Sequence, residues 1–183
     1  MSYVKTYNPG QIRMDLPTAN YIHELPLLSF SDIHGAVNLS LVFNYAMKAE
    51  GSNPYNIAPG YKLNLQKRLI IENGIPIKFQ DESGKYVDLI GATSPYTFDD
   101  DSQRILRTTG DIITPYVIEN PDFSTEKYNS SGLIIYAVDK YGTTVLTYTY
   151  SNNKLASILY RGNKIIQFSY YSDNNQLEYI TFN

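Results

Sequence analysis

The sequence predicts an all-β protein in which antiparallel hairpin repeats form a curved or partly coiled sheet. Three observations support this fold class. Apolar and polar residues alternate over short segments, turn-forming residues separate these segments, and the last third of the chain nearly repeats a tyrosine-rich hairpin. No window shows the long 3.6-residue period of an amphipathic helix. The 18 tyrosines suit such a sheet, because a tyrosine ring covers a pleated surface while its hydroxyl reaches water or a neighbour.

The first part of the chain is expected to form an arm followed by extended strands. Residues 1–20 are polar and irregular, which indicates an N-terminal arm. Residues 21–48 contain two extended segments, with a turn at residues 32–35 between them. The second segment alternates over residues 37–44 between an apolar face and a more polar face. Residues 61–71 alternate again and predict one amphipathic strand.

Two later hairpins share one turn chemistry. Asp81 and Asp139 each begin a turn that ends three residues later at Gly84 or Gly142. The aspartate accepts hydrogen bonds from the turn's backbone amides, and the glycine takes the positive φ that closes the turn. Asp139 and Gly142 are therefore predicted to be structural. The intervening residues 91–130 show no regular pattern and are expected to form an irregular insert.

The C-terminal repeat has the same order of residue types in both copies. An aromatic pair, spaced by one residue, precedes an Asn-rich turn, a leucine and then an isoleucine. The copies differ in length only in the turn, where extra residues cost little. The positions that we predict to be structural in this repeat are Tyr148, Tyr150, Leu155, Phe168, Tyr170 and Leu177.

The order of these motifs resembles the YD-repeat proteins of the bacterial Rhs family, which include toxin-complex shell subunits. Residues 148–155 are similar to the family repeat, with Ser151 in place of the usual aspartate. In the first half, Tyr61 stands where the family has a tryptophan. The other segments that carry the resemblance are Leu25-Pro26-Leu27, residues 39–45, residues 60–69 and the hairpin of residues 78–89.

The resemblance implies a structural protein whose hairpins coil into a hollow shell around a toxin or effector. It divides a single hairpin-repeat domain, residues 21–183, into Rhs-like opening strands at 21–90, the insert at 91–130 and YD-like repeats at 131–183. The implied partners are further YD repeats or effector cargo, of the same or a neighbouring chain, and self-association is expected. The 183 residues are too few to close a shell, and they contain neither the family's self-cleaving segment nor a toxin domain. We therefore expect a fragment, an excised domain or a small relative.

Catalytic and metal-binding interpretations are weaker than structural ones. Asp32 and His34 could act as an orienting group and a base in a hydrolase, but an exposed turn explains the same residues. With no cysteine and no Gly-x-Ser-x-Gly motif, we predict no enzymatic activity. The acidic run at residues 99–101 could bind calcium, but it lacks the spacing of an EF-hand. A solvated acidic loop is the favoured interpretation, and no metal or cofactor is predicted.

A carbohydrate- or cell-surface-binding module, as on a cell wall or phage tail, is the alternative function. The aromatic rings of Tyr148, Tyr150, Tyr170 and Tyr171 would face the sugar, whereas the structural interpretation makes them cross-strand packing pairs. Nucleic acid is not expected, because the 15 Lys+Arg residues are scattered and the net charge is -3. No apolar run has the length of a signal peptide or a membrane span. We expect a soluble protein of unknown localisation, for which secretion without an amino-terminal signal is an option.

Overall fold

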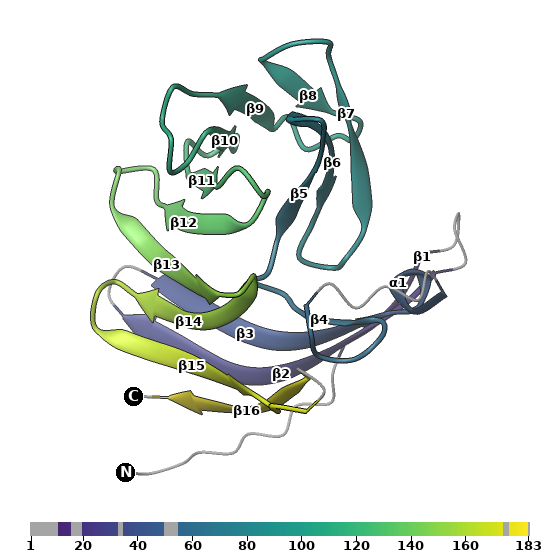
Figure 1. Cartoon of the computed structure of the whole chain (residues 1–183), viewed down its shortest axis with the longest axis vertical. Coiled ribbons are helices and arrows are strands. Elements are labelled where there is room, and N and C mark those ends of the chain that lie inside the picture. Colours follow the sequence, from purple (N-terminus) through teal and green to yellow (C-terminus); the bar gives the residue numbers. More distant parts are fainter. Residues whose placement is uncertain (1–10, 16–19, 33–34, 50–54, 174–175, 183) are drawn as a thin grey trace. The chain divides into compact units, whose positions relative to one another are not determined.

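The computed structural model describes residues 11–15, 20–32, 35–49, 55–173 and 176–182, and it is nearly all β (Figure 1). The prediction of an all-β, antiparallel fold is confirmed. The chain divides into two compact units, where one domain over residues 21–183 was expected. Unit 1 comprises Met1–Leu65 and Glu82–Gly84, and unit 2 comprises Gln66–Asp81 and Lys85–Asn183.

Unit 1 contains a four-stranded antiparallel sheet in the order β1-β2-β3-β4. The expected hairpin is present, with Asp32 of β2 opposite Gly35 of β3; residues 33–34 lie outside the described part of the chain. The expectation of an irregular arm is wrong for β1, because its residues form a ladder with β2 that begins at Gln11↔Glu24. The strands are β1 (Gln11–Asp15), β2 (Asn20–Asp32), β3 (Gly35–Asn44) and β4 (Tyr61–Leu63).

Over residues 40–44 the more polar face of β3 is the more deeply buried one, contrary to what its alternation indicates, although Leu39 of the apolar face is also fully buried. Ser40, Val42 and Asn44 are buried, whereas Leu41 is only half-buried. Asn44 can be buried because its side chain has hydrogen-bond partners. It is the N-cap of the short helix α1 (Tyr45–Ala49), and its Oδ1 accepts hydrogen bonds from the backbone amides of Ala46 and Met47. Its Nδ2 donates to the carbonyl oxygen of Ser83 at 2.9 Å.

The expected single strand at residues 61–71 is interrupted between β4 and β5 (Arg68–Glu72). The interruption follows from Asn64. Its side-chain amide accepts a hydrogen bond from the backbone N–H of Ser40 and donates one to the carbonyl oxygen of Asn38, both at 2.9 Å. The side chain of Asn64 thus continues the hydrogen bonding to β3 beyond the end of β4, and the chain then enters unit 2 at Gln66.

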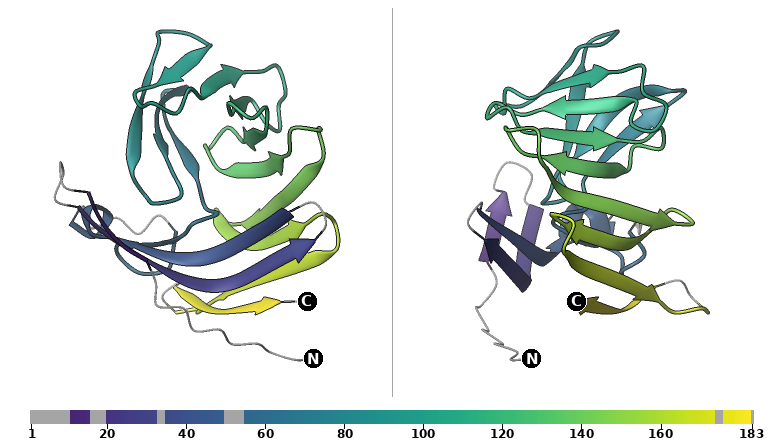
Figure 2. Two further views of the ribbon diagram at one scale, coloured as in Figure 1. Left: turned by 180° about the vertical axis from the view of Figure 1, so that it is seen from behind. Right: turned by 90° about the vertical axis from the view of Figure 1, so that its left-hand side faces the viewer.

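Unit 2 is a twelve-stranded antiparallel meander in which every strand pairs with its sequence neighbours, and successive strands lie beside one another in Figure 2. The prediction of an irregular insert at residues 91–130 is wrong, because this segment supplies four strands of the same sheet. They are only three or four residues long, too short for alternation to be recognised. From β6 onwards the strands are β6 (Ile75–Gln80), β7 (Tyr86–Ile90), β8 (Tyr96–Phe98), β9 (Ile105–Thr108), β10 (Tyr116–Glu119), β11 (Thr125–Tyr128), β12 (Ile134–Val138), β13 (Thr144–Ser151), β14 (Lys154–Tyr160), β15 (Lys164–Tyr170) and β16 (Leu177–Phe182).

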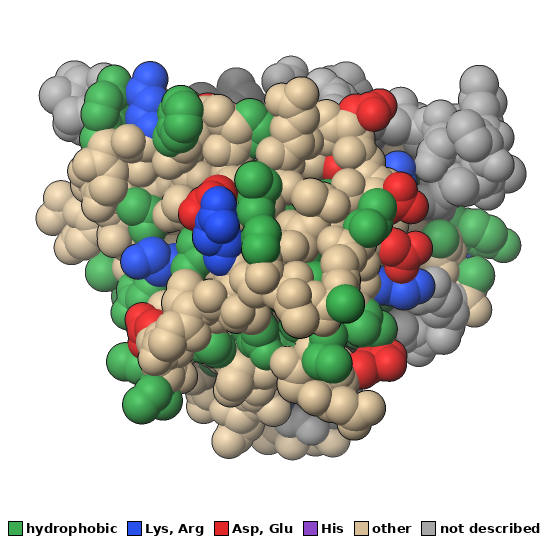
Figure 3. All heavy atoms as spheres, turned by 90° about the horizontal axis from the view of Figure 1, so that it is seen from above, with side chains coloured by type: hydrophobic (Ala, Val, Ile, Leu, Met, Phe, Trp, Pro, Cys, Tyr) green, Lys and Arg blue, Asp and Glu red, His purple; other side chains and the backbone are tan. Residues whose placement is uncertain are grey.

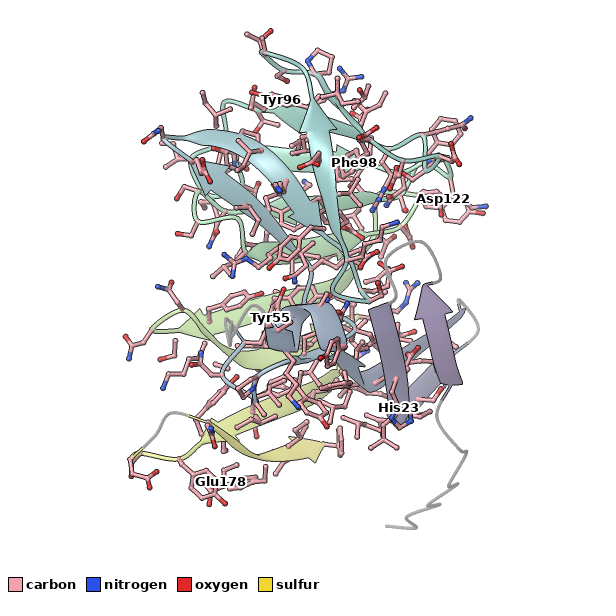
Figure 4. All side chains as sticks on the ribbon, turned by 90° about the vertical axis from the view of Figure 1, so that its right-hand side faces the viewer. His23, Tyr55, Tyr96, Phe98, Asp122 and Glu178 are labelled. Carbon is pink, nitrogen blue, oxygen red and sulfur yellow. The ribbon has the colours of Figure 1, made fainter. Side chains whose placement is uncertain are left out.

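Aromatic side chains fill the inside of the curved sheet. The ring of Phe79 on β6 meets those of Phe98 on β8 and Tyr128 on β11 edge-on, with centroids 5.5 and 6.4 Å apart. The guanidinium of Arg104 lies over both phenylalanine rings, at 4.7 Å from Phe79 and 4.5 Å from Phe98 (Figure 4 labels Phe98). Because β6, β8 and β11 are not neighbours in the sheet, these contacts span its interior. This part of unit 2 therefore has a packed core.

Candidate functional site

One hairpin geometry recurs along unit 2. In β13–β14, Tyr148 pairs with Ile158 and Tyr150 with Leu155, with a register shift between Thr149 and Tyr150. In β15–β16 the same shift lies between Ser169 and Tyr170, and the equivalent pairs are Phe168↔Ile180 and Tyr170↔Leu177. The residues that correspond in the sequence repeat therefore also occupy corresponding positions in the two hairpins.

Two further hairpins have this register and were not recognised from the sequence. In β5–β6, Leu69 pairs with Phe79 and Ile71 with Pro76, and the shift again precedes the second pair. The hairpin β11–β12 has its shift between Lys127 and Tyr128. The hairpin β12–β13 has the same shift between Ala137 and Val138. A β-bulge bends its strand and increases the local twist, so a bulge at the same place in each of these five hairpins accounts for a sheet that coils. Asn73-Gly74 in the β5–β6 turn is the signal that could have revealed the first of them.

The sheet stays open, but its coiling brings β5 beside the β11–β12 turn, as the curve of strands β5 to β12 in Figure 1 shows. The backbone N–H of Leu69 donates to the carbonyl oxygen of Gly132 at 2.8 Å, and Arg68 forms an antiparallel bridge with Leu133. A Cβ on Gly132 would lie 2.1 Å from the carbonyl oxygen of Leu69. Only glycine therefore permits this approach.

A buried polar network lies behind this close approach. The ammonium group of Lys67 contacts Glu126 Oε1 at 2.6 Å, and the hydroxyl of Tyr128 donates to Glu126 Oε2 at 2.6 Å. Tyr128 is fully buried, so this carboxylate supplies the acceptor that its hydroxyl needs. The network joins β11 to the segment that precedes β5.

The predicted ligand-facing tyrosines separate into buried and exposed side chains. Tyr148 is 4% exposed, and Tyr150 and Tyr170 are partly buried. The hydroxyl of Tyr170 donates to the carbonyl oxygen of Leu155 at 2.9 Å. Tyr171, at 46%, is the one exposed member of the four. The interior position of Tyr148 leaves its ring unable to stack on a ligand, because cross-strand packing already covers it.

Raising the pH is expected to destabilise unit 2 through its buried tyrosines. Burial is the main cause that raises the pKa of Tyr128 and of Tyr148 well above 10.0, and the negative charge of Glu126 adds to it. Both hydroxyls therefore ionise mainly after unfolding. Stability is complete below a pH of about 10 and falls as the pH rises from there towards the folded-state pKa, by about 1.4 kcal/mol per pH unit for each tyrosine.

Urea denaturation at about pH 9 and about pH 11 measures this loss. The variant carrying both Tyr128→Phe and Tyr148→Phe is the control, because phenylalanine cannot ionise. We expect the double variant to lose clearly less stability over this interval than the natural chain. Equal losses in the two proteins would contradict the assignment.

The predicted turn residues Asp139 and Gly142 form the expected structure. Asp139 Oδ1 accepts hydrogen bonds from the backbone amides of Tyr141 and Thr143, and Gly142 has a φ of 82°. The hydrogen bond from the Thr143 amide is the main cause that lowers the pKa of Asp139. The same turn occurs at Asn129, and its Asn-x-x-Gly sequence is the signal that identifies it.

The acidic run contributes to a turn. Asp100 accepts hydrogen bonds from Ser102 and forms an ion pair with Arg104 at 2.7 Å. Burial acts to raise the pKa of this carboxyl, but these contacts together outweigh it and lower the pKa. Within the described residues, no three His, Cys, Asp or Glu side chains are grouped to hold a metal ion. His34 lies outside the described part of the chain, so the Asp32–His34 interpretation stays a hypothesis.

The surface and the comparisons with known proteins add no further assignment. Acidic and basic side chains are interspersed on the face that Figure 3 shows. Among the helical residues that the structure describes, none belongs to a helix long and apolar enough to span a bilayer. No protein-family model and no curated protein matches the chain.

Proposed function

We propose that this chain is a structural β-repeat protein that forms part of an encapsulating shell around a secreted or delivered effector. The recurrence of one bulged hairpin in a coiling sheet supports this role, because repeats of that kind build extended walls by stacking. The aromatic core inside the curve of β5 to β12 leaves little room for cargo there. In this proposal these strands form a filled end of the shell.

The observation that carries the proposal is a difference between equivalent residues of β14 and β16. Leu155 and Ile158 of β14 are buried at 1% and 0% exposure. Leu177 and Ile180 of β16 occupy the same register but are only half-buried. Strand β14 has neighbours on both sides, whereas β16 pairs with β15 alone among the described strands. A further strand beside β16 would bury these side chains, as β13 and β15 do for β14.

Association through the β16 edge tests this proposal. Sedimentation velocity over a wide range of protein concentration is expected to show reversible association, because a free strand edge with apolar side chains pairs with other strands. Ile180→Lys should abolish it by placing a charge at the edge.

Thr97→Lys is the matched control, because it places the same charge at an exposed position of β8, a strand with neighbours on both sides. This variant should associate as the natural chain does. A monomer at every concentration would contradict the proposed stacking role.

Carbohydrate binding is the second candidate function. The observation that favours it is the exposure of Tyr171 and Tyr179, at 46% and 53%, on the β15–β16 hairpin. Exposed aromatic faces can stack on sugar rings. Binding on a glycan array that is lost in Tyr171→Ala would favour this module over the scaffold.

A further inference from the structure

Phe123 occupies a position that glycine takes in the equivalent turns. The β10–β11 turn has the hydrogen bond of the other Asx turns, from the backbone N–H of Asn120 to the carbonyl oxygen of Ser124 at 2.9 Å. Its fourth residue, Phe123, has a φ of 67°. The corresponding φ is 77° at Gly132 and 82° at Gly142. A bulky side chain at positive φ is strained, and asparagine or glycine would relieve that strain.

The ring of Phe123 gains no burial in return. Phe123 is 82% exposed, so its strain is not offset by packing within the described residues. Backbone strain that local packing does not explain is found most often at functional positions. A large apolar side chain on a projecting turn also suits a contact with another molecule.

A second exposed aromatic side chain lies on the adjacent turn. Because Thr125 of β11 pairs with Val138 of β12, the β10–β11 and β12–β13 turns are neighbours. Tyr141 on the second turn is 82% exposed, and the ammonium group of Lys140 lies 5.1 Å from its ring centroid. The positive charge of Lys140 also acts on the Asp122 carboxyl, which Figure 4 labels on the first turn.

The exposed charged side chains of these two turns and of the neighbouring β8–β9 turn are mainly acidic, with Lys140 as the exposed cation among three exposed aspartates. The β8–β9, β10–β11 and β12–β13 turns lie at the same ends of the strands, since alternate turns of a meander lie on the same side. We call this side of the meander the turn edge, to distinguish it from the edge strand β16. Asp99, Asp101 and Asp122 are exposed there. The guanidinium groups of Arg104 and Arg161 are engaged with Asp100 and Asp139, at 2.7 and 3.5 Å. A partner that complements the turn edge would therefore carry positive charge as well as apolar side chains.

We propose that the tips of the β10–β11 and β12–β13 turns form a docking surface for a polypeptide segment that carries basic and apolar side chains. Phe123 is the apolar anchor, Tyr141 extends the contact, and Asp122 with its acidic neighbours attracts the basic residues. The surface is independent of the β16 edge and of the shell role.

Selection from a displayed library of short random peptides on the full chain tests this surface. We expect enriched peptides that combine Lys or Arg with apolar residues. Their affinity should fall about tenfold or more in Phe123→Gly, because anchor residues carry most of the binding energy. Higher salt should weaken their binding. Ile112→Ala is the matched control, since Ile112 is 93% exposed but lies in the β9–β10 loop on the other side of the meander; it should bind as the natural chain does.

The stability of the same variant separates docking from a structural role. Phe123→Gly removes strain and is expected to raise the urea midpoint while it removes binding. A lowered midpoint would show that Phe123 acts in folding and would overturn the proposal. So would a library without peptides whose binding depends on Phe123, enrichment of acidic peptides, or Phe123-dependent binding to a glycan array in place of peptides.

Discussion

Gly132→Ala is expected to lower the free energy of unfolding of unit 2 by about 3 kcal/mol or more. Alanine at a φ of 77° costs about 1 kcal/mol by itself. The added Cβ would also lie 2.1 Å from the carbonyl oxygen of Leu69, so the hydrogen bond from the Leu69 amide to residue 132 must lengthen or break. Urea denaturation followed by tyrosine fluorescence measures the change, since the chain has 18 tyrosines and no tryptophan.

Gly142→Ala isolates the contribution of the close approach at Gly132. Gly142 has the same turn chemistry and a φ of 82°, but nothing lies within 4 Å of where its Cβ would be. This variant should lose only about 1 kcal/mol. The difference between the two variants measures the close approach of β5 to the β11–β12 turn. Equal losses would mean that this approach does not stabilise the coil.

Phe79→Ala is expected to destabilise unit 2 by about 3–5 kcal/mol. The side chain is fully buried, and it contacts Phe98, Tyr128 and Arg104 from strands and a turn that are far apart along the chain. Its removal leaves a cavity that the surrounding strands can fill only in part, because their pairing holds them in place. The same urea denaturation reports the loss, and amide hydrogen exchange in β10 and β11 should rise with it.

Phe123→Ala is the control for Phe79→Ala. It removes the same ring from a side chain that is 82% exposed, and both residues at this position are strained at positive φ. The stability should change by no more than about 0.5 kcal/mol. A loss in Phe79→Ala no larger than this would mean that the aromatic contacts across the coil do not hold it together.

In the C-terminal repeat, local sequence patterns were enough to predict which residues pair across the strands. The aromatic pair, the Asn-rich turn and the following leucine and isoleucine predicted which residues pair across β13–β14 and β15–β16. Asn152 and Asn153 have φ values of 50° and 62°, which asparagine tolerates better than most residues, so the turn could be identified from residue type alone. The strands from β8 to β11 have only three or four residues each, which is too short for an alternation of apolar and polar residues to be recognised.

The burial of the candidate site residues could not be predicted from local sequence. Tyr148 and Tyr171 belong to the same tyrosine-rich repeat, yet one is buried and the other exposed. Phe123 could not be singled out either, because nothing in Asn120-Pro121-Asp122-Phe123 shows that the phenylalanine takes the position of a glycine. Whether a tyrosine is buried, and whether a residue takes the glycine position of a turn, both depend on how the strands pair.

The sequence by itself determined the all-β class, the antiparallel hairpins and the chemistry of the Asp139–Gly142 turn, because each depends on residues close together in the chain. Only the tertiary structure decided that the meander coils until Leu69 meets Gly132, and that Phe79, Phe98 and Tyr128 share one core. The curvature of the sheet is the sum of small bends at five bulges. Contacts between distant strands then select the coiled arrangement, and no local pattern encodes those contacts.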